Sequence, residues 1–210
     1  MIATTYPELG EKTESLEAAE KFAEQIRGKT ILVTGPGGGI GFSTVKAFAT
    51  QSPSHLIVAG RNPTRIQGSI DALKVNFPKV ELRCLELDLS NQKSVREAAA
   101  KVLTWKDVPT MDILVNNAAV MNLPERMLNE DGIETQFATN HVGNLLFTCL
   151  IIPKLFKVAE TSPRGATRVI NVSYLSSVVA GMSWSDINFN KINKALPEAE
   201  QPPYSTHTLE

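Results

Sequence analysis

The feature that most constrains the fold is a short apolar run that leads directly into a cluster of glycines. Residues 30–34 (TILVT) are nearly all apolar, as expected for a strand that is buried on both faces. Residues 35–41 (GPGGGIG) follow at once, and a helical pattern comes after them. A strand that turns sharply into a helix needs residues without a Cβ, and the helix N-terminus then offers N–H groups to an anion. The spacing T-G-x-x-x-G-x-G is not that of a P-loop, because no Lys-Ser/Thr pair follows. The sequence therefore predicts a phosphate-binding turn.

The rest of the chain alternates between strand-like and helical patterns. The strand-like runs cover residues 55–59, 79–87, 112–116 and 168–172. The helical patterns cover residues 64–77, 94–103 and 133–156. Such alternation implies crossover connections, so we expect an α/β fold with a doubly wound parallel sheet of the Rossmann kind.

Three regions follow from this pattern. An extra N-terminal helix is expected over residues 9–27, with Gly28 at its end, so that residues 1–28 precede the sheet. Residues 29–173 form the predicted dinucleotide-binding domain. Residues 174–210 hold no clear periodic element and several prolines, and we expect an irregular tail there.

Composition excludes several classes of protein. The chain has 210 residues, a formal net charge of −1 and 42% hydrophobic residues, so it has no basic excess to suggest nucleic-acid binding. The longest apolar segment, residues 145–152, is short of the roughly 20 residues that a membrane span needs. No secretory signal is visible at the N-terminus, so a cytoplasmic protein is expected. Cys84 and Cys149 lie in apolar stretches and are predicted to be reduced, buried core residues.

The end of the second predicted strand indicates which dinucleotide is bound. Arg61 follows this strand, 20 residues after Gly41, and Arg65 lies one helical turn further on. Dinucleotide folds usually carry an acid here for the ribose 2′-hydroxyl, whereas an arginine accommodates a 2′-phosphate. The sequence therefore favours NADP(H) over NAD(H). The alternative is that Arg61 is an ordinary exposed arginine.

Several motifs together resemble the short-chain dehydrogenase/reductase family. They are, in order along the chain, TGPGGGIG (34–41), LDL (87–89), NNAA (116–119), NHVG (140–143) and VINVS (169–173). The segments AGRN, EDGIE-x-QF and TNHVGN-x-LFT are most similar in sequence to the retinol-dehydrogenase and WW-domain-oxidoreductase subgroup. The leading helix and the tail resemble filamentous-fungal members, which often act in secondary metabolism.

The resemblance implies a role for individual residues. The implied cofactor-binding residues are Thr34, Gly35, Gly37, Gly39, Ile40, Gly41, Arg61, Asp88, Leu89, Asn117 and Ala118. Asp88 would hydrogen-bond the adenine amino group, and the alternative for it is a plain turn residue. Asn116 would stabilise the central strand. Asn140 would bind the water of a proton relay, and the alternative is a buried helix asparagine bonded to backbone.

The sequence departs from the family pattern at the catalytic residues. The family uses a Tyr-x-x-x-Lys pair after the fifth strand, but Tyr174 is followed four residues later by Val178 and Tyr204 by Thr208. The serine that polarises the substrate oxygen would fall on Tyr174 by ungapped matching. Ser173 or Ser176 could replace it only if the strand end shifts, so Ser173 is a candidate only. We expect a truncated product, a misannotated gene model or a degenerate family member that lacks the last helices and strands. Its exposed apolar surface favours association or instability.

Three functions remain open from the sequence. The resemblance implies an NADP-dependent oxidoreductase that transfers hydride between NADP(H) and a small carbonyl or alcohol substrate, without nucleic-acid partners. The absence of the Tyr/Lys pair favours a catalytically dead dinucleotide-binding module or a truncated relic. A nucleotide-sugar-type enzyme such as an epimerase, on a related fold, is the third possibility.

Overall fold

The core of the molecule is a five-stranded parallel sheet. The computed structural model describes residues 6–121, 123–173 and 186–188. The strands are β1 (Thr30–Thr34), β2 (His55–Gly60), β3 (Glu81–Glu86), β4 (Ile113–Asn116) and β5 (Arg168–Asn171). Their order in the sheet is β3-β2-β1-β4-β5, and every neighbouring pair is parallel. The chain therefore reverses its direction of travel across the sheet between β1 and β4, which is the point where such folds bind ligands.

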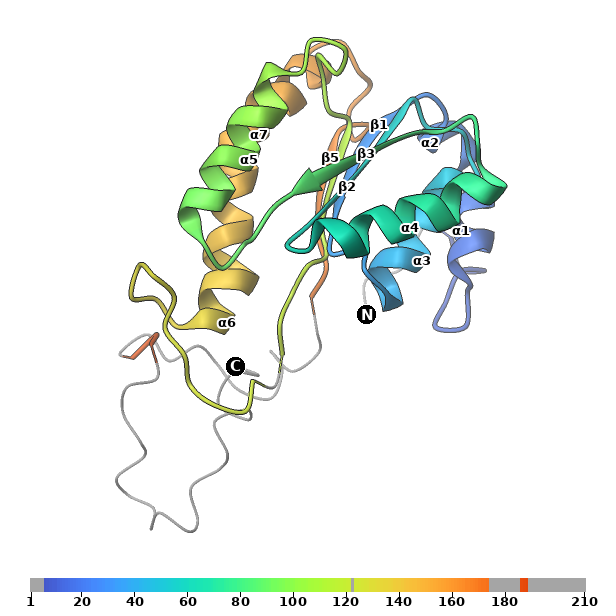
Figure 1. Cartoon of the computed structure of the whole chain (residues 1–210). Coiled ribbons are helices and arrows are strands. Elements are labelled where there is room, and N and C mark those ends of the chain that lie inside the picture. The colour runs from blue at the N-terminus through green and yellow to red at the C-terminus, as the bar shows by residue number, and fades with distance from the viewer. Residues whose placement is uncertain (1–5, 122, 174–185, 189–210) are drawn as a thin grey trace.

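Helices cover both faces of this sheet (Figure 1). One face carries α1 (Ser15–Lys21), α2 (Ala23–Ile26), α3 (Gly39–Ala49) and α4 (Pro63–Asn76). The other face carries α5 (Gln92–Thr104) and α7 (Asn144–Ala159). Because side chains alternate along a strand, Ile31 and Val33 of β1 join the first core, whereas Leu32 joins the second. The predicted doubly wound α/β fold is confirmed.

Asparagine side chains fix where two of these helices begin. Asn62 accepts a hydrogen bond from the Arg65 backbone N–H at 3.0 Å, and Pro63 occupies the first turn of α4. Asn91 accepts one from the Ser94 N–H at 3.0 Å in the same way before α5. Asparagine is among the best N-cap residues because its side-chain oxygen satisfies an N–H that the helix itself leaves unpaired.

A buried carboxylate ties the starts of three strands together. Asp112, which is 7% exposed, accepts from the Lys29 ammonium and from the Thr30 backbone N–H, both at 2.9 Å. Its own backbone oxygen accepts from the Arg168 N–H at 2.9 Å. Asp112 thus links the beginnings of β1, β4 and β5, at the end of the sheet opposite the glycine turn.

The N-terminal helix is shorter than the sequence predicts. Helix begins at Ser15 rather than near residue 9, and it is divided at Phe22, where the backbone leaves helical geometry (φ −109°, ψ 27°). Only part of the predicted apolar face is used, since Ala19 and Ile26 are buried whereas Leu16 is 43% exposed. Gly28 follows α2 with φ +71°, in keeping with its predicted role at the helix end.

The predicted long helix over residues 133–156 is interrupted by a wider turn. It consists of α6 (Thr135–Phe137), a π-helix, η1 (Ala138–Gly143), and α7. By length and composition this stretch, Thr135–Ala159, could cross a membrane. In the structure its residues Phe147, Ile151 and Leu155 pack in the core against the sheet and α5. A core helix of a globular domain has the same composition, so the finding carries little weight for a membrane.

The two cysteines differ from the expectation of a buried pair. Both are free thiols, as predicted, but Cys149 is exposed on α7 and Cys84 is half-buried on β3. Burial raises the pKa of the Cys84 thiol. The expectation for Cys149 was wrong because a helix as apolar as α7 does not reveal from sequence which of its faces meets the core.

Candidate functional site

The site begins at the turn from β1 into α3, where two glycines permit close contact. Gly35 has φ +72°, and a Cβ at this position would lie 2.8 Å from the Ala118 Cα. A Cβ on Gly41 would lie 2.2 Å from the Gly35 backbone oxygen and 2.6 Å from the Asn117 Nδ2. These positions therefore need glycine so that the turn, the helix and the end of β4 can pack together.

Hydrogen bonds hold the ends of β1 and β4 side by side. The Thr34 hydroxyl accepts from the backbone N–H groups of Asn117 (3.0 Å) and Ala118 (2.9 Å). The Asn117 amide donates to the backbone oxygens of Thr34 (2.9 Å) and Gly35 (3.3 Å). Thr34, Asn117 and Ala118, all predicted as cofactor residues, thus build the framework on which the glycine turn rests.

The N-terminus of α3 opens without a side-chain cap. Gly38 occupies the cap position, makes no side-chain hydrogen bond, and no acidic residue lies in the first turn. A Cβ on Gly38 or Gly39 would meet no heavy atom within 4 Å, so the space beside them is open. Because no side chain caps this helix end and no acid lies in its first turn, it is electrically positive and available to an anion, whereas α4 and α5 are each capped by an asparagine.

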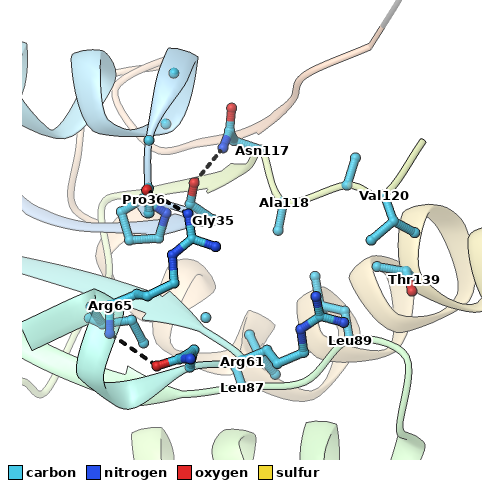
Figure 2. Close-up of a pocket in the computed structure, with 18 of the residues that line it drawn as sticks. Gly35, Pro36, Arg61, Arg65, Leu87, Leu89, Asn117, Ala118, Val120 and Thr139 are labelled. Carbon is cyan, nitrogen blue, oxygen red and sulfur yellow. Dashed lines mark hydrogen bonds between the residues drawn. The ribbon is translucent and has the colours of Figure 1, made fainter. Parts of the chain in front are cut away.

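A cleft of about 640 Å³ extends from this turn along the carboxyl ends of β2, β3 and β4. Figure 2 shows part of its wall, with Arg61 and Arg65 on one side and Ala118, Val120 and Thr139 across from them. The predicted cofactor residues that line it are Gly35, Gly37, Gly39, Ile40, Gly41, Arg61, Asp88, Leu89, Asn117 and Ala118. Thr34, the remaining one, supports this wall from behind through the bonds described above.

The charges along the cleft favour an anionic ligand. Arg61 and Arg65 contribute cations, and Asp88 is the sole carboxylate among the described residues that line the cleft. No acid occupies the end of β2, where Gly60, Arg61 and Asn62 follow one another. Arg61 is exposed and makes no hydrogen bond or ion pair with the described residues, whereas Arg65 donates to the Gly37 backbone oxygen at 3.3 Å.

Asp88 and Leu89 form the floor of the cleft after β3. The Asp88 carboxylate accepts from the Ser90 backbone N–H (2.9 Å) and hydroxyl (2.7 Å) through one oxygen, Oδ1. The turn role considered for Asp88 is thus present, and the residue also lines the cleft. Leu89 is 4% exposed, and its backbone oxygen touches the π-helix, since a Cβ on Gly143 would lie 2.1 Å from it.

A second cleft of about 600 Å³ adjoins the first and contains both predicted catalytic residues. The two clefts share Ile40 and the loop after β4. Asn140 lies in η1 and pins this loop, because its side chain accepts from the Val120 N–H and donates to the Val120 oxygen, both at 2.8 Å. Asn140 is exposed rather than buried, although it does bond to backbone. Ser173 is exposed on the same cleft, just after β5.

The sequence did not predict a chain of hydrogen-bonded polar side chains across the second cleft. The Asn116 amide donates to the Thr148 hydroxyl (3.0 Å) and to the Asn171 side-chain oxygen (2.9 Å), and Thr148 in turn donates to the Asn144 backbone oxygen (2.8 Å). These residues join β4, β5 and α7. Thr148 was the available signal, because it interrupts an otherwise apolar helical run. Tyr174 and Tyr204 lie outside the described residues, as do all residues of the expected tail except 186–188.

Comparison with known proteins identifies the family to which this fold and its glycine-lined cleft belong. The short chain dehydrogenase family model matches residues 29–186, and the chain belongs to this family. Among its relatives, the oxidoreductase fscI of Fusarium equiseti is 35% identical over 189 residues, covering 90% of this chain and 72% of that protein. Human retinol dehydrogenase 13 is 35% identical over 164 residues, covering 78% of this chain and 46% of that protein.

Solved structures agree on the fold. The bulky-bulky ketone specific alcohol dehydrogenase of Comamonas testosteroni matches with a TM-score of 0.58 at 20% identity, covering 76% of this chain and 60% of that one. A short chain dehydrogenase of Escherichia coli CFT073 complexed with NADPH matches with a TM-score of 0.53 at 19% identity, covering 64% of this chain and 56% of that one.

Proposed function

We propose that the protein is an NADP(H)-dependent oxidoreductase that transfers hydride between the nicotinamide and a small carbonyl or alcohol compound. The observation that carries the cofactor choice is the end of β2, where the cleft presents Arg61 and Arg65 but no carboxylate. An acid there would repel a 2′-phosphate, whereas an arginine pairs with it through several N–H donors. The NADPH complex of the Escherichia coli structure supports the same choice, although that likeness is one of fold.

The residues present fit such a cofactor. The uncapped N-terminus of α3 would hold the pyrophosphate, Arg61 the 2′-phosphate and Asp88 the adenine amino group. When bound, the dinucleotide supplies the hydride chemistry. The second cleft, with Asn140 and Ser173, adjoins the first and would take the substrate, with the Ser173 hydroxyl donating to the substrate oxygen. The sequence contains no Tyr-x-x-x-Lys pair, so we assign no acid–base residue.

We also propose a role in secondary metabolism, because the chain resembles fungal members, and, separately, a cytoplasmic location. The 35% identity to the Fusarium oxidoreductase supports a fungal relationship. Both placements are proposals about the whole protein.

Titration of the chain with NADPH and NADH, followed by nucleotide fluorescence, tests the cofactor choice. We expect NADPH to bind more tightly, and Arg61→Ala to weaken NADPH about ten- to a hundredfold by removing a charged hydrogen bond to the 2′-phosphate. NADH affinity should change little. Arg96→Ala on α5, also exposed but outside the cleft, is the matched control. Equal affinities of the unmodified chain for NADPH and NADH would refute the proposal.

A further inference from the structure

Helix α4 contacts two successive backbone oxygens of the glycine turn. The Arg65 guanidinium donates to the Gly37 oxygen through Nη2 at 3.3 Å. The Ser69 hydroxyl lies 3.3 Å from the Pro36 oxygen and 3.1 Å from the Arg65 oxygen, so its one proton is shared between the two. Arg65 and Ser69 are four residues apart on α4 and therefore lie on one face of the helix, the face that meets the turn.

These two contacts determine which way the N–H groups of the turn point. In a trans peptide the C=O and the following N–H point in opposite directions, and the described chain contains no cis peptide. Because the Pro36 and Gly37 oxygens point to α4, the N–H groups of Gly37 and Gly38 point away from it. Neither N–H has an acceptor among the described residues. Beside Gly38 the space is open, so these donors are available to a ligand.

The two arginines of the cleft thus differ in whether they bond to the described part of the protein. Arg65 is held against the turn by its bond to Gly37 and lies 3.7 Å from the place a Gly37 Cβ would occupy. Arg61, one helical turn earlier, makes no bond to the described part of the protein. Figure 2 shows the Arg65 side chain directed toward Gly35 and Pro36, with Arg61 lying nearer Leu89.

We infer that Arg65 and Ser69 are positioning residues that hold the glycine turn with its N–H groups directed at the pyrophosphate, while Arg61 alone reads the 2′-phosphate. This inference rests on the proposed function, because it concerns the same cofactor. Its consequence is a division between the side chains. Arg65 and Ser69 act on the part of the ligand that NADPH and NADH share, and Arg61 acts on the part in which they differ.

Binding of three nucleotides to the full chain tests this division. The ligands are NADPH, NADH and ADP, which has the pyrophosphate but no 2′-phosphate. We expect Ser69→Ala and Arg65→Gln to weaken all three by a similar factor, about three- to tenfold, because each removes one hydrogen bond that holds the turn rather than a bond to the ligand. The effect of Ser69→Ala should not depend on salt, whereas that of Arg61→Ala on NADPH should shrink as salt rises. Ser69→Thr keeps the hydroxyl and should bind all three nucleotides as the unmodified chain does. This variant separates loss of the hydroxyl from a general disturbance of the fold.

Gln67→Ala is the matched control, because Gln67 lies on the same helix and, among the described residues, its side chain bonds to the exposed Asp71 alone, at 2.8 Å. It should leave all three affinities unchanged. If Arg65→Gln weakened the binding of NADPH but not that of NADH or ADP, Arg65 would be a second residue that binds the 2′-phosphate. That result would overturn the inference.

Hydrogen exchange separates this inference from the proposed function. In the chain without nucleotide, we expect Ser69→Ala and Arg65→Gln to raise amide exchange at Gly35 and Phe42, whose N–H groups bracket the turn and bond to the Ala59 and Gly38 oxygens, while α4 stays protected. If the unmodified chain binds neither dinucleotide, the proposed function fails, and the exchange result still decides the inference. Unchanged exchange at both amides would overturn it.

Discussion

Among single residues, Lys154 is unusual because its ammonium group is buried. The residue is 6% exposed, and its Nζ donates to the backbone oxygens of Trp105 (3.1 Å) and Val108. Burial, and secondarily the nearby Lys157, lower the pKa of Lys154, whereas Asp107 acts in the opposite direction. The lysine therefore joins the end of α5 to the loop before β4 at the cost of desolvating a charge.

We predict that Lys154→Met lowers the free energy of unfolding by about 1–3 kcal/mol, because two buried oxygens lose their donor. Since folding lowers the pKa of Lys154, the unfolded chain binds this proton more tightly, and the lysine contributes more stability as the pH rises toward 10.5. Urea unfolding of both proteins at neutral pH and near the usual lysine pKa measures the difference, which should grow with pH. Lys74→Met, exposed on α4 and not among the groups that shift the pKa of Lys154, is the control. A difference that shrinks toward alkaline pH would contradict the argument.

The two thiols should react at different rates. Cys149 is exposed on α7, whereas Cys84 is half-buried and burial raises its thiol pKa, which reduces the reactive thiolate. We expect a maleimide or aromatic disulfide reagent to label one thiol per folded chain quickly and the other slowly. Cys149→Ser should abolish the fast phase and Cys84→Ser should preserve it. Two equally fast thiols would show that β3 opens more readily than its packing implies.

Residue types and spacing predicted the glycine turn, because backbone geometry restricts them, and the family resemblance supplied the other predicted residues that line the first cleft. Only glycine tolerates the contacts made by Gly35 and Gly41, so the pattern marks the turn directly. The sequence could not predict that Arg65 bonds to the turn while Arg61 makes no bond to the described residues, since this difference depends on where α4 lies against the turn. The side-chain bonds of Asn140 to Val120 were equally hidden, because nothing local in the sequence joins these residues.

At the level of elements, the π-helix explains the glycine of the NHVG segment. Gly143 ends η1, and a Cβ there would lie 2.1 Å from the Leu89 backbone oxygen, which cannot move as a side chain could. π-Helical turns frequently occur at functional sites, and this one joins the floor of the first cleft to Asn140 on the second.

A pair of glycine substitutions tests this contact. We expect Gly143→Ala to destabilise the fold by about 1–3 kcal/mol through overpacking. Gly68→Ala inside α4, where a Cβ would meet nothing within 4 Å, should instead stabilise it by roughly 0.5–1 kcal/mol through helix propensity. Urea unfolding measures both. Equal effects of the two substitutions would mean that the close approach of Gly143 to Leu89 does not constrain the protein.

Periodicity identified all five strands and the existence of the main helices, but it could not locate the interruptions. The helical pattern over residues 133–156 does not reveal η1, because its six residues are too few to alter a pattern that is read over a much longer helix. At the N-terminus the pattern overstated the helix, since Leu16 matches the apolar spacing yet remains exposed. Interruptions of this kind arise from tertiary contacts that no local window contains.

On the scale of the whole molecule, β3 and β5 are the two edge strands of the sheet within the described residues. β5 pairs with β4 alone within the described residues, and all four of its residues are exposed. Val169 and Ile170 are 39% and 38% exposed, and Val172 just after the strand is 44% exposed. A strand edge with apolar side chains on both faces favours pairing with another chain.

We therefore predict that the 210-residue chain associates with itself through β5. Sedimentation velocity over a range of concentrations should show a concentration-dependent increase in size, and Ile170→Lys should suppress it by placing a charge on the edge strand. Val75→Lys is the matched control, because Val75 is 80% exposed on α4, away from β5. It should leave association unchanged. If both substitutions act equally, general apolar exposure rather than the β5 edge drives the association, and a chain that stays monomeric at every concentration would refute the prediction outright.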